Sequence, residues 1–172
     1  MAAHGSKSKP AGGTPFRADL AKPEFETLLS ELRLCEEEAA LMGRSVSRWM
    51  RGEPVRSNWL MFPSRTRLQP HPRGVVLILG TWNYPVRLAV APVLAAVAAG
   101  NRVVLKPSER APATSRALRE LFSETVGDDV VAVVEGGRDV AEALLDHPFD
   151  LVFFTGGATA GRAVYQRAAA HG

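Results

Sequence analysis

Four short apolar runs, rich in β-branched residues, recur from residue 75 onward, and a helical pattern follows each of them. Continuous apolar strands separated by helices of this length are typical of a parallel sheet that is covered on both faces and joined by right-handed crossovers. The pattern therefore predicts an α/β fold with a doubly wound parallel sheet. The expected strands are Val75–Leu79, Arg102–Leu105, Val130–Val134 and Leu151–Phe154, and the expected helices are Pro85–Ala99, Ala113–Phe122, Val140–Asp146 and Ala158–Ala170.

A helical pattern also precedes the sheet. Apolar residues from Phe25 to Cys35 recur at spacings of three and four beside glutamates, as in an amphipathic helix. The periodicity continues until a glycine and a proline stop it, so we predict one helix over Pro23–Met50. The segment Thr66–Pro72 alternates and carries two prolines, which predicts an edge strand or an extended arm.

Length and composition fit one domain with a short appendage. The chain has 172 residues, of which 46% are hydrophobic and 23% charged, and this balance excludes a disordered or fibrous chain. Residues 1–15 are rich in Gly, Ser, Lys and Pro and lack the apolar core of a signal peptide, so we expect a disordered leader. Residues 16–65 are expected to form an N-terminal helical segment, and residues 66–172 the sheet domain.

Charge and cysteine content narrow the location and the partners. The net charge is +3, but most of the basic residues are arginines scattered singly among apolar positions, which argues against a nucleic-acid groove. The single cysteine, Cys35, cannot form an intramolecular disulfide, so we expect a reducing compartment, the cytoplasm. No apolar stretch reaches the roughly 20 residues of a membrane span. Neither a membrane span nor a metal site is predicted.

Ligands of doubly wound sheets bind at the carboxyl ends of the strands, so the residues after each predicted strand are the candidate site. Trp82 and Asn83 follow the first strand. Two interpretations of Asn83 stay open: a cap of the following helix, or an oxyanion donor whose side-chain amide faces a carbonyl oxygen. Trp82 could line the site or belong to the core.

Lys106 and Glu109 follow the second strand. They are either solvated loop charges or a pair that meets the ribose hydroxyls of a nucleotide, a role that acidic residues serve at strand ends. A carboxylate there would oppose a 2′-phosphate, which favours NAD over NADP. The third corner, Glu135-Gly136-Gly137, is interpreted as a turn.

A glycine-rich turn, Gly156 to Gly161, leads from the fourth strand into the last predicted helix. Amides at a helix N-terminus bind phosphate, which supports a pyrophosphate contact there. The turn departs from the usual dinucleotide fingerprint because Ala158 stands where a glycine is expected. The acidic Glu109 also precedes the turn instead of following it, which disfavours an ordinary Rossmann dehydrogenase.

Three segments together, GVVLILGTWNYP, AAGNRVVLKPSE and FDLVFFTGGATAG, resemble the aldehyde dehydrogenase superfamily. The Trp-Asn-Tyr-Pro form and the upstream DLAKPEFETLLSE resemble its class-three branch, which includes fatty-aldehyde and coniferyl-aldehyde dehydrogenases. The resemblance covers about residues 19–172. It implies a Rossmann-like NAD-binding domain, with NADP possible, and oxidation of an aldehyde to a carboxylic acid through a cysteine nucleophile, a thiohemiacetal and hydride transfer.

The resemblance assigns a role to each candidate residue. It makes Asn83 the catalytic oxyanion donor, Lys106 and Glu109 the ribose contacts, and Trp82 part of the cofactor cleft. The pyrophosphate-facing turn would comprise Gly156, Gly157, Thr159 and Gly161. Many members have serine where this chain has Gly157, so one hydroxyl contact is absent.

The resemblance also places the catalytic glutamate shortly after the position of Gly172, and the nucleophilic cysteine beyond that. We therefore expect a partial aldehyde dehydrogenase: a truncated NAD(P)-binding domain that is inactive alone and belongs to a homo-oligomer in its complete form. Cys35 lies on an apolar helix face and is expected to be a core thiol. The alternative is a non-catalytic module that binds nucleotide or another protein.

Overall fold

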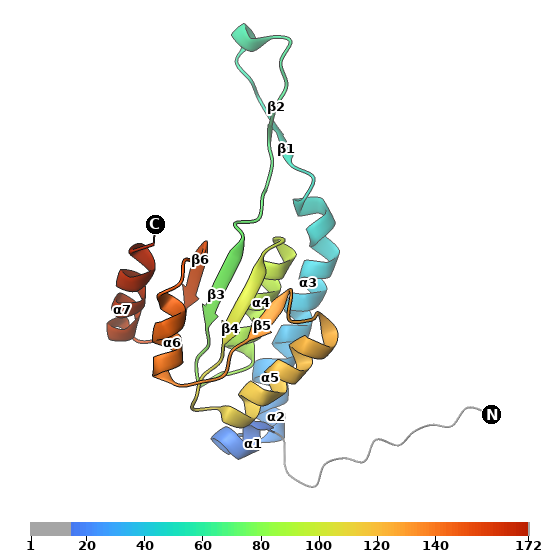
Figure 1. The fold of residues 1–172 in the computed structure, drawn as a ribbon. Helices are drawn as coiled ribbons and strands as arrows, with labels where there is room; N and C mark the ends of the chain where they lie inside the picture. Colours follow the sequence, from blue (N-terminus) through green and yellow to red (C-terminus); the bar gives the residue numbers. More distant parts are fainter. Residues whose placement is uncertain (1–14, 172) are drawn as a thin grey trace, which may run out of the picture.

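The computed structural model describes residues 15–171 and contains a four-stranded parallel sheet in the order β5-β4-β3-β6 (Figure 1). The strands are β3 (Val75–Leu79), β4 (Arg102–Lys106), β5 (Val131–Val133) and β6 (Leu151–Phe154). The chain adds β4 and β5 on one side of β3 and then returns to pair β6 with the other side. The predicted doubly wound sheet is confirmed, and its order reverses between β3 and β6.

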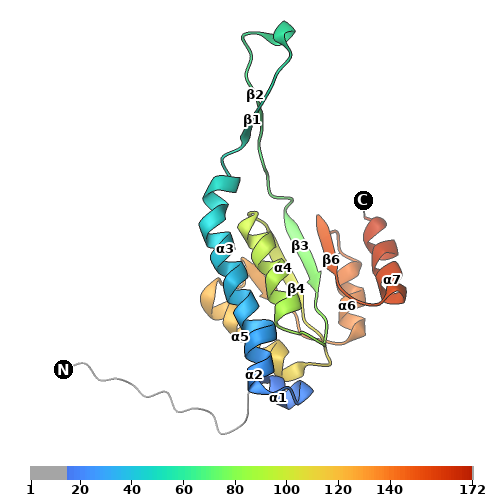
Figure 2. The same ribbon diagram turned by 180° about the vertical axis from the view of Figure 1, so that it is seen from behind.

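Helices cover both faces of the sheet because successive side chains of the strands point to opposite faces. Val76 and Ile78 pack with α4 (Arg87–Ala98) and α5 (Pro112–Thr125). Leu77 and Leu79 pack with α6 (Arg138–Leu145) and α7 (Ala158–Ala169). The ribbon seen from both sides shows the two helical layers with the sheet between them (Figures 1 and 2).

The N-terminal segment is helical, as predicted. After α1 (Pro15–Leu20), a continuous run comprises α2 (Glu24–Thr27), a π-helical turn (Leu28–Leu32) and α3 (Arg33–Trp49), which lies against α4. This run matches the predicted helix over residues 23–50. The predicted leader falls on residues 1–14, outside the described residues, and on Pro15, which begins α1.

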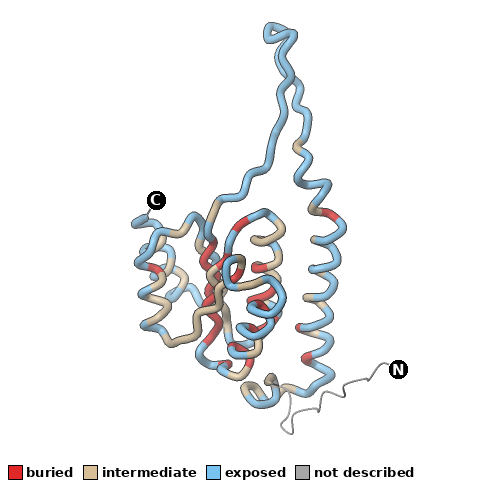
Figure 3. The backbone as a smooth tube through the Cα atoms, turned by 45° about the vertical axis from the view of Figure 1, so that its right-hand side comes forward, coloured by how far each residue is buried: buried red, intermediate tan, exposed pale blue. Residues whose placement is uncertain are grey.

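An extended arm connects α3 to the sheet. It contains β1 (Glu53–Val55) paired antiparallel with β2 (Thr66–Leu68), and a 3₁₀ turn (Trp59–Met61) lies at its tip. The arm is exposed along its length, including Trp59 at 82% and Phe62 at 87% (Figure 3). An extended segment was predicted for residues 66–72, which include β2, whereas no pattern in the sequence predicts β1.

Candidate functional site

A cleft of about 970 Å³ opens at the carboxyl ends of the sheet strands, between the corners that follow β3, β4 and β6. Its position coincides with the reversal of strand order, where doubly wound sheets bind ligands. Seven of the eight predicted site residues line it: Trp82, Asn83, Lys106, Glu109, Gly156, Gly157 and Thr159. Candidate residues that are spread over about 75 positions of the sequence therefore meet at one opening.

The eighth residue, Gly161, does not line the cleft. It borders a shallower hollow on α7 with Arg162 and Tyr165. A side chain at position 161 would stand 3.5 Å from the ring of Phe154, and one at Gly156 would overlap that ring. A Cβ at 3.5 Å makes an ordinary contact, so it is Gly156 that allows Phe154, itself a lining residue, to pack against the turn.

The corners after β3 and β4 are locked together at Gly80. Its amide donates to the carbonyl oxygen of Lys106 at 2.8 Å, and an added Cβ would stand 3.1 Å from the Cα of Pro107. Only glycine permits this approach without a shift of the backbone. The loop carrying Asn83 therefore starts at a fixed distance from the Lys106 corner.

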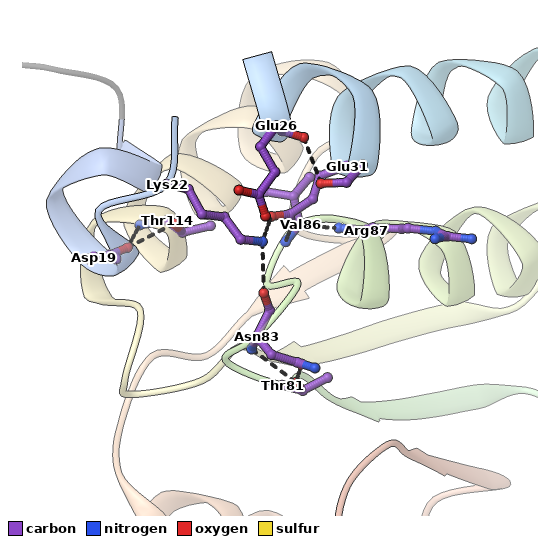
Figure 4. Close-up of polar contacts among 10 residues, drawn as sticks. Asp19, Lys22, Glu26, Glu31, Thr81, Asn83, Val86, Arg87 and Thr114 are labelled. Carbon is purple, nitrogen blue, oxygen red and sulfur yellow. Dashed lines mark hydrogen bonds and ion pairs between the residues drawn. The ribbon is translucent and has the colours of Figure 1, made fainter. Parts of the chain in front are cut away.

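Asn83 does not cap the following helix, so the capping interpretation is wrong. The helix α4 begins at Arg87 with Val86 as its N-cap residue, three positions beyond Asn83. Asn83 is exposed, and its Oδ1 accepts a hydrogen bond from the Thr81 hydroxyl (Figure 4). Among the described residues, no acceptor occupies the Asn83 Nδ2 group. This arrangement leaves an amide donor available at the rim of the cleft.

Lys106 and Glu109 form an ion pair of 2.8 Å between Nζ and Oε2. Lys106 is only 4% exposed, so it is not a solvated loop charge, whereas the Glu109 side chain is 49% exposed. The hydrogen bond from Lys106 lowers the pKa of Glu109 below its ordinary value. The cleft therefore presents an ionised carboxylate that can accept two hydroxyl groups.

The glycine turn places the N-terminus of α7 beside the cleft. Gly157 is the N-cap residue, and no side chain caps the first amides of this 12-residue helix. Free amides and the positive end of the helix dipole favour an anionic group. Gly156, Gly157 and Thr159 line the cleft at this point.

Two arginines in the cleft lining were not predicted. Arg138 begins α6 and pairs with Glu142 at 2.7 Å, and this contact lowers the pKa of Glu142. Arg167 from α7 pairs with Asp146 at 3.0 Å. Arg138 directly follows the third corner, where the strand-end rule could have found it. Arg167 lies inside a helix, and its position carries no sequence signal.

Cys35 lies away from this cleft, on α3, where it packs against the core beneath α4. Burial, followed by the charge of Glu31, raises its pKa to about 11. A thiol in that state is protonated at neutral pH and is a poor nucleophile. The expectation of a core thiol agrees with this environment.

The sequence profile of the aldehyde dehydrogenase family matches residues 18–172. The chain belongs to the aldehyde dehydrogenase family. It is 44% identical over 151 residues to aldehyde dehydrogenase family 3 member I1, chloroplastic, of Arabidopsis thaliana, a match that covers 88% of this chain and 28% of that protein. It is 43% identical to family 3 member B3 of Mus musculus, over 89% of this chain and 32% of the relative. The resemblance to the class-three branch is confirmed.

Solved structures agree with the family. The substrate-bound state of Staphylococcus aureus AldH matches with a TM-score of 0.89 at 32% identity, over 91% of this chain and 34% of that one. A Mycobacterium tuberculosis aldehyde dehydrogenase complexed with NAD+ matches with a TM-score of 0.67 at 32% identity, over 78% and 28%. The NADP-dependent glyceraldehyde-3-phosphate dehydrogenase from Bacillus halodurans, complexed with NADP, gives 0.76 at 27%, over 89% and 33%.

The chain spans about a third of the length of the curated relatives it matches. Within residues 15–171, no helix is both long and apolar enough to cross a membrane. The same part of the chain contains no cluster of three or more His, Cys, Asp or Glu side chains that could hold a metal ion.

Proposed function

We propose that this chain is the cofactor-binding part of an NAD(P)-dependent aldehyde dehydrogenase that oxidises an aldehyde to a carboxylic acid. The observation that carries the proposal is the cleft itself. It combines an ionised carboxylate, a free amide donor and an uncapped helix N-terminus at the reversal point of the sheet. Residues 66–172 would form the partial NAD(P)-binding domain, and residues 16–65 the N-terminal helical segment.

The residues fit a dinucleotide in a definite order. Glu109, held by Lys106, would accept the adenosine ribose hydroxyls, and the amides from Gly156 to Thr159 would face the pyrophosphate. Trp82 is half-exposed in the same lining and would border the bound dinucleotide. The nicotinamide supplies the hydride acceptor when it is bound. Because the solved relatives hold either NAD+ or NADP, the preference for NAD rests on the carboxylate of Glu109.

Asn83 would serve the chemical step. Its Nδ2 group can donate to the aldehyde oxygen, whose negative charge grows as a nucleophile attacks the carbonyl carbon. The side chain is oriented by Thr81, so little reorganisation is needed at that moment. Residues of this chain thus bind the cofactor and stabilise the oxyanion, and the nucleophile and general base come from the remaining catalytic segments.

On its own, the 172-residue chain would not oxidise aldehydes. Its single cysteine has a raised pKa and lies outside the cleft lining. Covalent catalysis needs an activated nucleophile. Reduced cofactor formed by the purified chain, and abolished by Cys35→Ser, would overturn this part of the proposal.

The complete enzyme would be a cytoplasmic homo-oligomer. The arm supports association because four consecutive apolar residues at its tip are exposed: Trp59, Leu60, Met61 and Phe62. Exposed apolar patches of this kind mark interaction surfaces. Sedimentation of the complete enzyme tests the assembly, and a monomer at micromolar concentration would contradict it. The single cysteine supports a reducing compartment, which cell fractionation tests.

The decisive experiment replaces Asn83 by alanine in the complete enzyme, with the remaining catalytic segments supplied from a class-three relative. Loss of one oxyanion donor should lower turnover about a hundredfold, roughly 3 kcal/mol, with little change in cofactor affinity. Steady-state kinetics and a cofactor titration on the same preparation give both quantities. Normal turnover in the folded variant would remove Asn83 from the chemistry.

A further inference from the structure

The loop that carries Asn83 is held by two residues of the N-terminal segment. Lys22 Nζ donates to the Asn83 carbonyl oxygen at 2.8 Å and to Glu31 Oε1 at 2.8 Å (Figure 4). The same ammonium group lies 4.0 Å from the centre of the Tyr84 ring. Lys22 therefore contacts Asn83 through a hydrogen bond and Tyr84 through a cation–π interaction.

Glu31 holds the other end of this loop. Its side chain is fully buried, and Oε2 accepts hydrogen bonds from the amides of Val86 at 2.8 Å and Arg87 at 3.3 Å. These amides stand at the start of α4, where backbone donors have no partner within the helix. The N-cap residue, Val86, makes no side-chain capping hydrogen bond to them. A carboxylate 55 residues away thus fixes the start of the helix.

The two contacts depend on each other. A buried carboxylate is costly without a partner, and Lys22, whose side chain is 13% exposed, supplies the compensating charge. The pair brackets residues 83–87 from both ends, while the Thr81 hydroxyl holds the side chain of Asn83. The backbone of Asn83 is therefore held from outside its own loop by Lys22, and its side chain is held from within the loop by Thr81.

We propose that Lys22 and Glu31 are positioning residues that orient the Asn83 side-chain amide toward the substrate oxygen. This inference rests on the proposed oxyanion role of Asn83. The ion pair touches no reacting atom. It acts by holding the Asn83 carbonyl oxygen and the α4 amides in place. The position of the Asn83 Nδ2 group depends on this backbone.

Asp19 provides a matched comparison within the same segment. Its carboxylate caps α5 by accepting from the amides of Ala113 at 3.0 Å and Thr114 at 2.7 Å. No hydrogen bond links Asp19 to Asn83 among the described residues. Loss of Asp19 should therefore reduce stability without the effect on turnover that loss of Lys22 produces.

The test is a double-mutant cycle in the complete enzyme. Lys22→Met, which keeps the apolar stem, should lower kcat about tenfold and leave the KM for the cofactor unchanged, because a small misplacement of a catalytic group is costly. Lys22→Arg should restore most of this loss. In the Asn83→Ala background, Lys22→Met should have almost no further effect on kcat, whereas Asp19→Asn should leave kcat unchanged in either background.

Two results would overturn the inference in different ways. If Lys22→Met lowers kcat tenfold both with and without the Asn83 amide, the effect is a general structural one. If Lys22→Met leaves kcat unchanged while Asn83→Ala lowers it, Lys22 does not position Asn83. Full turnover in Asn83→Ala would instead defeat the proposed function itself. If Lys22→Met fails to fold, the neutral pair Lys22→Gln with Glu31→Gln leaves no unpaired buried charge and should give the same loss.

Discussion

Glu109 has two tasks that a single carboxylate can perform together. Its contact with Lys106 compensates a cation that is almost completely buried, and its exposed half faces the cleft. Replacing it would leave Lys106 with a buried, unpaired charge, which is costly. The residue is thus constrained both by folding and by the ligand that we propose for the cleft.

Cofactor preference depends on that carboxylate. The chain should bind NADP more weakly than NAD, because an ionised Glu109 repels a 2′-phosphate, and Glu109→Gln should narrow the difference. Since the pKa of Glu109 is lowered, the preference should not change between pH 7 and 8.5; protonation sets in only as the pH falls toward that lowered pKa. Calorimetric titrations with both cofactors measure the ratio.

Equal affinity for the two cofactors in the unaltered chain would contradict this role of Glu109. The same conclusion would follow if Glu109→Gln left the ratio unchanged. Glu135, which pairs with Arg119 and does not line the cleft, offers a control: Glu135→Gln should not affect the ratio.

At the scale of elements, the sequence pattern predicted the four sheet strands because each is a short apolar run, including the edge strand β6, of which one face is exposed. The starts of the helices were less predictable. The helix α4 was expected from Pro85 and begins at Arg87, where the Glu31 carboxylate meets the backbone amides. A carboxylate that caps the helix from 55 residues away leaves no local signal, whereas an asparagine before a predicted helix suggests a cap because Asn is a preferred N-cap residue.

Other elements also depend on contacts that a local pattern does not contain. The strand β1 has three exposed residues, one of them Pro54, and exists because it pairs with β2. Within the site, the rule that ligands meet strand ends found the residues after β3, β4 and β6. It missed Arg167, which reaches the cleft from inside α7.

The capping carboxylates give a test at this scale. Asp19→Ala should lower the free energy of unfolding by about 1 kcal/mol, the usual cost of a lost N-cap, because three hydrogen bonds to Ala113 and Thr114 disappear. Denaturant titration of the chain measures it. Asp128→Ala, at an exposed position outside this contact, is the control and should change stability little. Equal effects of the two substitutions would show that Asp19 does not stabilise α5.

At the scale of the whole molecule, the exposed apolar side chains of the described residues include two groups, one on the edge strand β6 and one at the tip of the arm. Leu151 and Phe153 on the edge strand β6 are 43% and 41% exposed, and the arm tip is more exposed still. The cleft lies at the other boundary of β6, where the strand leads into the glycine turn. Surfaces that favour association and the proposed cofactor site are thus separate parts of one fold.

The central proposal is that the cleft binds a dinucleotide, and backbone amide NMR of the labelled 172-residue chain during titration with NAD is its sharpest test. Saturable shifts should occur at Gly80, Lys106 and the Gly156–Thr159 turn, the three corners that line the cleft. Arg162 and Tyr165, on the separate hollow of α7, should not respond. Absence of saturable shifts at millimolar NAD, or shifts only outside these corners, would show that the cleft is not the dinucleotide site.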